Sequence, residues 1–251
     1  MTSTSKKVLF SVLQWVCVVL VVFLLWHVVA VVQDNPLLYP DLADVLAQTG
    51  SLLLQGETYL SLCYTLLRSL VAFAVSVVVA FALAVCAGLF NSSKKIIDVI
   101  VLIFRSVPTM AIIFIALMMF SSSAVPCFVA VLVAFPVAYS AFVRETSFDD
   151  KLNEVCDVYE VTKRKKLKYV LLPQIKNAFL PQCKDSLPLC IKVVIAGEAL
   201  SLPLRGLGKD MYSAKVSLET AQVLALTILT LVVCLIIQSL FGWLEKKYGS
   251  V

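Results

Sequence analysis

Six long apolar runs divide this chain, and they restrict its fold more than any other feature of the sequence. Each run has about 20 residues or more, the length that a helix needs to cross roughly 30 Å of hydrocarbon. We expect membrane spans at about residues 8–32, 60–90, 96–120, 124–143, 175–200 and 220–244, of which the fifth is the least apolar. The first run is too long for the apolar part of a cleavable signal peptide, so we expect it to remain as a span.

The composition agrees with an all-α membrane protein. The 251 residues are 61% hydrophobic and 15% charged, whereas an average soluble domain is roughly 45–50% apolar and about 25% charged. Transmembrane strands alternate apolar and polar residues over about ten positions, and these runs do not alternate. We therefore predict a single polytopic domain over residues 1–251, with about six transmembrane helices.

Basic residues gather on one side of the predicted spans. They are Lys6, Lys7, Lys94, Lys95, Lys246, Lys247 and eight residues from Arg144 to Lys176, together 14 of the 21 basic residues. Because Lys and Arg accumulate in cytoplasmic loops, this pattern predicts that both termini are cytoplasmic. The net charge of +5 therefore indicates topology. It accompanies no motif that reads nucleic acid, so we expect no nucleic-acid partner.

The sequence lacks the residues that common enzymes need. No phosphate-binding GxxxxGK[ST] motif occurs, and Gly206 to Lys209 has the wrong spacing. The single histidine, His27, lies in an apolar run, and the eight cysteines form no CxxC pair. We expect no catalytic activity, no metal site and no bound cofactor in this chain.

The loop at 144–173 carries the most informative pattern. Ser147 and Asp150 resemble a capping box at a helix start. An apolar face at helical spacing follows, formed by Leu152, Val155, Cys156 and Tyr159. A helix lying flat on a bilayer favours basic residues along its whole polar face, whereas the first half of this segment is acidic. We therefore expect a short cytoplasmic helix that docks into a partner protein.

Glu154-Val155-Cys156, followed by Leu172-Pro173, resembles the EAA loop of permease subunits from ATP-binding-cassette (ABC) importers. In that family the loop forms a coupling helix that sits in a groove of the cytoplasmic ATPase. The coupling residues that the resemblance implies are Leu152, Glu154, Val155, Cys156, Tyr159, Glu160, Leu172 and Pro173. Glu160 stands where the family has a glycine, so the turn after the first helix is expected to continue as helix or to be completed differently.

The resemblance extends over nearly the whole chain and is closest to the nitrate, sulfonate and taurine permeases. It includes a proline-containing segment and short helix at 38–46, Arg68, Arg105-Ser-Val-Pro108, Ala196-Gly-Glu198 and Gly206-Leu-Gly208. It implies a type I importer fold in a bacterial inner membrane. The implied partners are a second permease copy or paralogue, two ATPase subunits that bind ATP and Mg, and an external substrate-binding protein. Two solute classes stay open: a small anion of the sulfonate, nitrate or taurine kind, and a thiamine-precursor-like or other planar nutrient.

Four charged residues lie within or beside the apolar runs, namely Arg68, Arg105, Lys192 and Glu198. An unpaired charge there costs at least a few kcal/mol, so each should face protein, water or an opposite charge. Arg68 is interpreted mainly as a packing residue, and the pathway candidates are Arg105, Lys192 and Glu198. We expect Lys192 to attract an anionic solute.

The alternative function is a stand-alone secondary transporter driven by an ion gradient. Such a protein would need intramembrane carboxylates or an internal repeat, and apart from Glu198 the sequence shows neither. A purely structural membrane scaffold would not explain the cytoplasmic loop.

Overall fold

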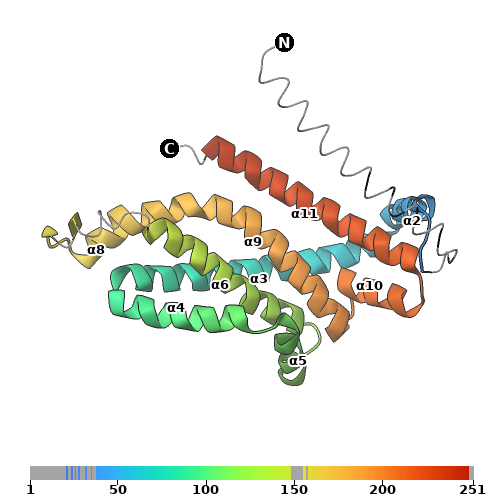
Figure 1. The fold of residues 1–251 in the computed structure, drawn as a ribbon, viewed down its shortest axis with the longest axis horizontal. Helices are drawn as coiled ribbons and strands as arrows, with labels where there is room; N and C mark the ends of the chain where they lie inside the picture. The colour runs from blue at the N-terminus through green and yellow to red at the C-terminus, as the bar shows by residue number, and fades with distance from the viewer. Residues whose placement is uncertain are drawn as a thin grey trace, which may run out of the picture.

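The computed structural model describes residues 38–147, 155–156 and 158–248, with six single positions between 21 and 35. The described elements are α2 (Leu42–Leu54), α3 (Gly56–Leu89), α4 (Asn91–Ser106), α5 (Thr109–Met119), α6 (Val125–Ser147), α8 (Lys163–Lys166), the π-helix η1 (Leu167–Leu171), α9 (Leu172–Ser201), α10 (Leu207–Val216) and α11 (Thr220–Tyr248). No strand occurs in these residues, and the all-α class is confirmed (Figure 1). The predicted span at 8–32 lies almost wholly outside them.

Three helices of the described part are long and apolar enough to cross a membrane. They are α3, α6 over Val125–Arg144, and α11 over Thr220–Lys247, and they coincide with the runs predicted at 60–90, 124–143 and 220–244. Helix α9 matches the fifth run but is less apolar. Many of its residues are buried among other helices, so its polar side chains are shielded from lipid.

The third run, expected as one helix at 96–120, is divided into α4 and α5. The two helices meet at an angle of 90°. Pro108 has no backbone N–H and disfavours helical geometry in the residue before it, and Val107 is accordingly extended, with φ −73° and ψ 128°. The Pro108 carbonyl then accepts the first hydrogen bonds of α5, from Ala111 and Ile112. The proline thus ends one helix and starts another in a new direction.

A stripe of small residues lets α3 pack closely against α6 and α9. The buried positions on α3 are Thr58, Ser61, Thr65, Ser69, Ala72, Ser76, Ala80, Ala84 and Ala87. They recur every three or four residues, the spacing of one helix face, and small side chains allow close backbone approach in membranes. The opposite face exposes Leu67, Leu70, Val71, Val75 and Val78, the apolar surface that lipid requires.

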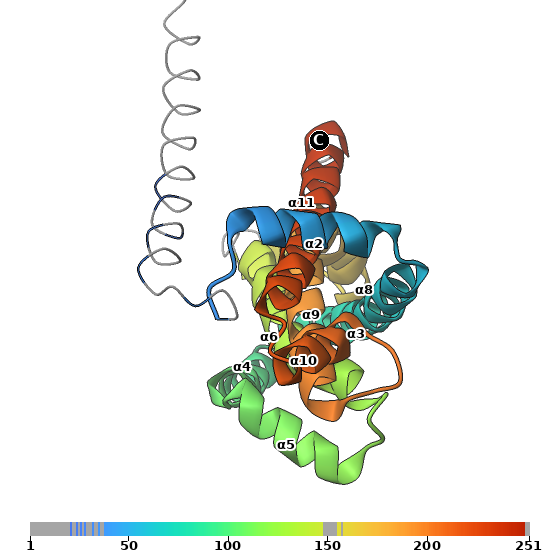
Figure 2. The same ribbon diagram turned by 90° about the vertical axis from the view of Figure 1, so that its right-hand side faces the viewer.

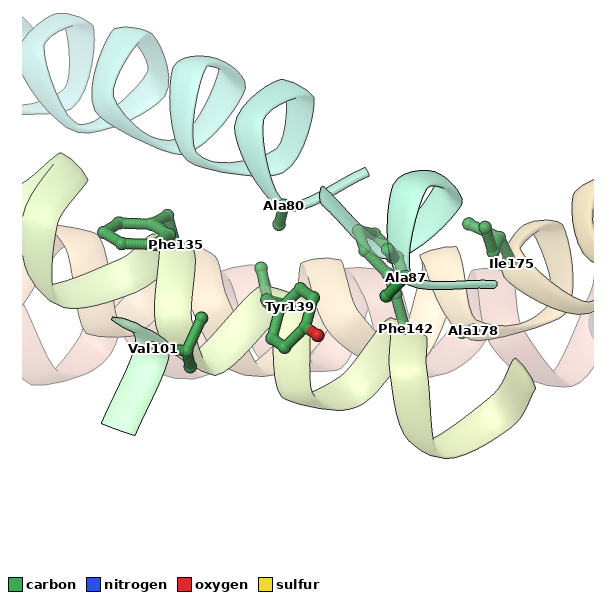
Figure 3. Close-up of a cluster of buried hydrophobic side chains, with 10 residues drawn as sticks. Ala80, Ala87, Val101, Phe135, Tyr139, Phe142, Ile175 and Ala178 are labelled. Atoms are coloured by element: carbon green, nitrogen blue, oxygen red, sulfur yellow. The ribbon is translucent and has the colours of Figure 1, made fainter. Parts of the chain in front are cut away.

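The core between α3, α4, α6 and α9 is made of alanines on α3 and aromatic side chains on α6 (Figure 3). Tyr139 and Phe142 of α6 are almost fully buried. The Phe104 ring of α4 meets Phe135 edge to face at 5.2 Å between centroids. The Tyr139 hydroxyl donates to Asp98 Oδ1 at 2.7 Å, so the one polar group of this aromatic cluster is paired.

The end of the bundle opposite α8 is closed by short helices. Figure 2 shows α2 crossing α11 at this end, with α10 beneath them. Leu52 of α2, Leu207 of α10, and Ala225 and Leu226 of α11 form a small buried cluster there. The short helix expected after the first predicted span is therefore present as α2, and its buried residues hold it on the bundle.

Candidate functional sites

The helical turn within the loop predicted at 144–173 ends at Glu160. Glu160 has a positive φ of 49°, and the Val161 N–H donates to the Cys156 carbonyl at 2.9 Å. This bond from the residue after a left-handed position defines the Schellman motif that closes many helices. The turn that the family makes with glycine is thus completed here with a glutamate.

The residues before this turn expose an apolar surface. Val158 and Tyr159 are 78% and 76% exposed, and Val155 is 49% exposed. Cys156 is separated from them, because it is buried within the chain. Leu152 and Glu154, the other predicted coupling residues of this segment, lie outside the described residues.

Leu172 and Pro173 lie at the start of α9, directly after the π-helix η1. Pro173 has no N–H for the Tyr169 carbonyl, and the Leu172 N–H reaches back to the Leu167 carbonyl in the wider π pattern. The buried Leu171 side chain lies against Gly88 of α3, where a Cβ atom would stand 2.9 Å from Leu171 Cδ2. The loop is therefore fixed to the end of α3 at the residue that precedes the Leu-Pro pair.

A second contact joins the loop to the corner between α3 and α4. The Lys163 ammonium lies 4.0 Å from the centre of the Phe90 ring, a cation–π arrangement. Phe90 is the residue between α3 and α4. The loop is therefore held on the long α3 at one point and on the α3–α4 corner at the other.

A buried ion pair links α3 to α9. Arg68 Nη1 donates to Glu198 Oε1 at 2.7 Å, and the Glu198 side chain is fully buried. The other carboxylate oxygen, Oε2, accepts from Thr65 Oγ1 at 2.9 Å and from the Gly208 N–H at 3.1 Å. Each carboxylate oxygen therefore has a donor, which is the condition for keeping a charge in a low-dielectric interior.

The same group fixes the loop before α10. Arg68 Nη1 also donates to the Arg205 carbonyl at 2.8 Å, and the Leu207 N–H donates to Thr65 Oγ1 at 2.9 Å. Gly206 has φ 155°, and a Cβ atom there would stand 2.5 Å from the Glu198 carboxylate. The Gly206-Leu-Gly208 motif thus fits its backbone around the carboxylate of the Ala-Gly-Glu motif.

The three pathway candidates occupy different places. Glu198 belongs to the buried ion pair. Lys192 is exposed on α9 beside Cys234 of α11. Arg105 lines a cavity of about 310 Å³ between α4 and α6, and its Nη1 donates to Ser140 Oγ at 3.2 Å. The structure does not bring the three together.

Sequence reasoning missed the partner of Glu198. Arg68 and Glu198 stand 130 positions apart, and neither helix alone places them together. The available signal was the presence of one arginine and one glutamate in otherwise apolar runs, since opposite charges within a membrane tend to pair. Thr65 and the carbonyl of Arg205 carried no signal in the sequence.

A further polar cavity, of about 420 Å³, lies beside the network at the α2 and α10 end. Its lining includes Glu57, Arg205, Lys209 and Asp210, and Arg205 Nη1 lies 3.2 Å from Glu57 Oε2. Within the described residues, no group of three His, Cys, Asp or Glu side chains is placed to hold a metal ion.

Comparison with known proteins assigns the family. No curated protein matches the chain. The family model described as "binding-protein-dependent transport system inner membrane component" matches residues 76–250. This range holds α4 to α11, including the loop turn at Glu160, the Arg105 cavity and Glu198. The match covers more than half of the chain, and the chain belongs to this family of ABC importer permeases.

Proposed function

We propose that this multi-pass permease subunit moves a small solute and couples its movement to ATP hydrolysis by two separate ATPase subunits. A second permease copy or paralogue would complete the pathway, and an extracytoplasmic binding protein would deliver the solute. The proposed location is a bacterial cytoplasmic membrane with both termini inside, in agreement with the basic residues at 163–168.

The observation that carries the coupling proposal is the exposed turn at 155–160. Apolar side chains as exposed as Val158 and Tyr159 are expected to contact a partner, because water exposure of such a group is unfavourable. The segment that follows the turn is anchored through Leu171 to α3 and through Lys163 to the α3–α4 corner. A push on the turn would therefore reach two membrane helices directly.

This anchoring suggests how the cycle proceeds. Closure of the ATPases on ATP would move the two coupling turns of a permease pair toward each other. The attached helices would shift with them and turn the cavity from inward-facing to outward-facing, where the binding protein releases its solute. ATP and Mg would be bound by the partner ATPases.

The test compares two exposed tyrosines. Tyr159 and Tyr169 are 76% and 68% exposed, and only Tyr159 belongs to the turn. We expect Tyr159→Ala to reduce ATPase co-purification and substrate-stimulated ATP turnover, and Tyr169→Ala to leave both near the wild-type level. Glu154→Lys should weaken association as well. Unchanged association and turnover in Tyr159→Ala and Glu154→Lys would overturn the coupling assignment.

The alternative, a secondary transporter, is less well supported by the geometry. Glu198 was its candidate ion-coupling carboxylate, and both oxygens of that carboxylate are engaged by protein donors. Uptake by the purified chain alone, driven by an ion gradient in the absence of nucleotide, would favour the alternative.

A further inference from the structure

Two arginines and one carboxylate line the cavity between α4 and α6. Arg105 of α4 and Arg144 of α6 both line it, together with Asp98, Tyr139 and Ser140. Within the described part of the chain, neither arginine forms an ion pair with a carboxylate. Arg105 lies in an apolar run, where an uncompensated charge is costly and marks a functional site.

The polar groups of the cavity leave most of the guanidinium donors available. Among the described residues Arg105 gives one hydrogen bond, to the neutral hydroxyl of Ser140 at 3.2 Å, whereas a guanidinium has five N–H donors. Asp98 already accepts from the Tyr139 hydroxyl at 2.7 Å. Asp98 also precedes Arg105 by seven positions, which is about 10 Å along a helix.

The two arginines lie close enough to serve one ligand. Ser140 is in contact with Arg105, and Arg144 is one helical turn further along α6, a rise of about 6 Å. Both side chains are exposed to the same cavity of about 310 Å³. Planar guanidinium groups bind the oxygens of carboxylate, sulfonate and similar anions through paired, charge-assisted hydrogen bonds.

We propose that this cavity is an oxyanion-binding site on the route of the solute, with Arg105 and Arg144 as its ligands. The inference rests on the proposed permease function and chooses the anionic solute class over the uncharged planar one. Among the described residues Asp98 is the one carboxylate that lines the cavity, so an uncharged ring would add no counter-charge for the second arginine. It would also find no aromatic face on Tyr139, which is 2% exposed.

The proposal assigns the role expected of Lys192 to a different place. Lys192 lies on α9 beside Cys234 of α11 and does not line the cavity between α4 and α6. It therefore provides a matched control, as an exposed cation of a predicted span that lies outside the proposed site.

The experiment uses the complete transporter, reconstituted with its ATPase and binding protein in lipid vesicles. The probes are nitrate, an alkanesulfonate and an uncharged aminopyrimidine. We expect Arg105→Gln and Arg144→Gln to lower uptake of the transported anion about tenfold or more, since each loses a charge-assisted bond. Arg105→Lys should keep part of the uptake, and Lys192→Gln should keep all of it.

A fourth variant tests the site without removing an arginine. Ser140→Asp places a carboxylate beside Arg105, where it should occupy the guanidinium as a bound anion would and so prevent anion uptake. Co-purification of every variant with the ATPase shows that the chain is folded and assembled. Anion uptake unaffected by Arg105→Gln and Ser140→Asp, or uptake of the aminopyrimidine alone, would overturn the site while leaving the permease function intact. If the unmodified transporter showed no nucleotide-driven uptake of any probe, the proposed function itself would be overturned.

Discussion

Arg68 and Glu198 form an ion pair of 2.7 Å between two helices, in a place where the glutamate is fully buried and the arginine side chain is 13% exposed. The pair also holds the backbone of the segment that leads into α10, through the Arg205 carbonyl and the Gly208 N–H. One ionic contact therefore joins three elements of the fold.

Removing either partner of this pair should destabilise the protein strongly. We expect Glu198→Ala or Arg68→Ala to lower the free energy of unfolding by about 3–5 kcal/mol, because each leaves a buried charge without its partner. Chemical unfolding in detergent, followed by circular dichroism, measures the loss. The control is Lys184→Ala, which breaks the half-exposed contact with Glu245 at 3.6 Å and should cost at most about 1 kcal/mol. Equal losses for the two pairs would contradict the role given to the buried one.

Gly206→Ala should disturb the Arg68–Glu198 ion pair by displacing the backbone that surrounds it. The added methyl would lie 2.5 Å from the Glu198 carboxylate at a φ of 155°, so the loop before α10 must move. Strain of this kind costs on the order of 1–3 kcal/mol. Gly50→Ala is the matched change, since nothing lies within 4 Å of its added Cβ, and it should stabilise α2 slightly. Proteolysis at the α10 loop reports the effect, and the same cleavage rate in both variants would argue against the close fit of Gly206.

Glu160→Gly should stabilise the turn at 155–160 and leave its proposed coupling to the ATPase unimpaired. A non-glycine residue in the left-handed region costs about 1–2 kcal/mol, and Glu160 has φ 49°. We expect Glu160→Gly to raise the unfolding free energy by about 1 kcal/mol, and Glu160→Val to lower it and to weaken ATPase association. Leu218 also has a positive φ, of 60°, and Leu218→Gly should give a similar gain in stability with no change in coupling. A stabilising effect of Glu160→Val would show that the turn is formed differently.

Asp210 should make stability depend on pH. Burial raises the pKa of this carboxyl above its ordinary value of 3.8, against opposing effects of a hydrogen bond from Ser61 and the charge of Lys209. The folded protein then holds this proton at a higher pH than the unfolded chain does. The contribution of Asp210 is therefore fully present below about pH 4 and is lost as pH rises through the folded pKa.

Asp210→Asn removes the titrating group and should flatten this dependence. Unfolding curves from about pH 4 to 7 would reveal the difference between the two proteins. The assignment to Asp210 would be contradicted if the unfolding free energy of the wild type rose with pH over this range. It would also be contradicted if Asp210→Asn had the same pH dependence as the wild type.

The fold was predictable where a pattern is local. The apolar runs indicate α3, α6 and α11 because one helix must satisfy its own backbone in lipid. The small residues on α3 recur at helical spacing, so its packed face was also readable. The angle between α4 and α5 was not, because Pro108 predicts an interruption but the direction of the new helix depends on packing against α6 and α9.

The candidate sites were predictable only in part, for the same reason. Glu160 stands at the position of a glycine in the family motif. The sequence did not reveal that the glutamate itself adopts the left-handed conformation, with φ 49°. The meeting of Arg68 with Glu198, and of Arg105 with Ser140, depends on how separate helices are arranged. These residues could be identified as charges inside apolar runs, but their partners depend on tertiary packing.

The succession of α8, η1 and α9 carries a mechanical consequence. From Lys163 to Ser201 the backbone is helical throughout, a length of about 58 Å at 1.5 Å per residue. The turn at 155–160, joined to α8 by the non-helical Val161 and Thr162, and Glu198 therefore lie near opposite ends of this helical segment. If an ATPase displaces the turn, as proposed, the movement would pass through the non-helical Val161 and Thr162 and then along continuous helix to the Glu198 end. This helical segment can bend at η1 and at Pro181 and Pro188 inside α9, so these positions set how stiffly its two ends are linked.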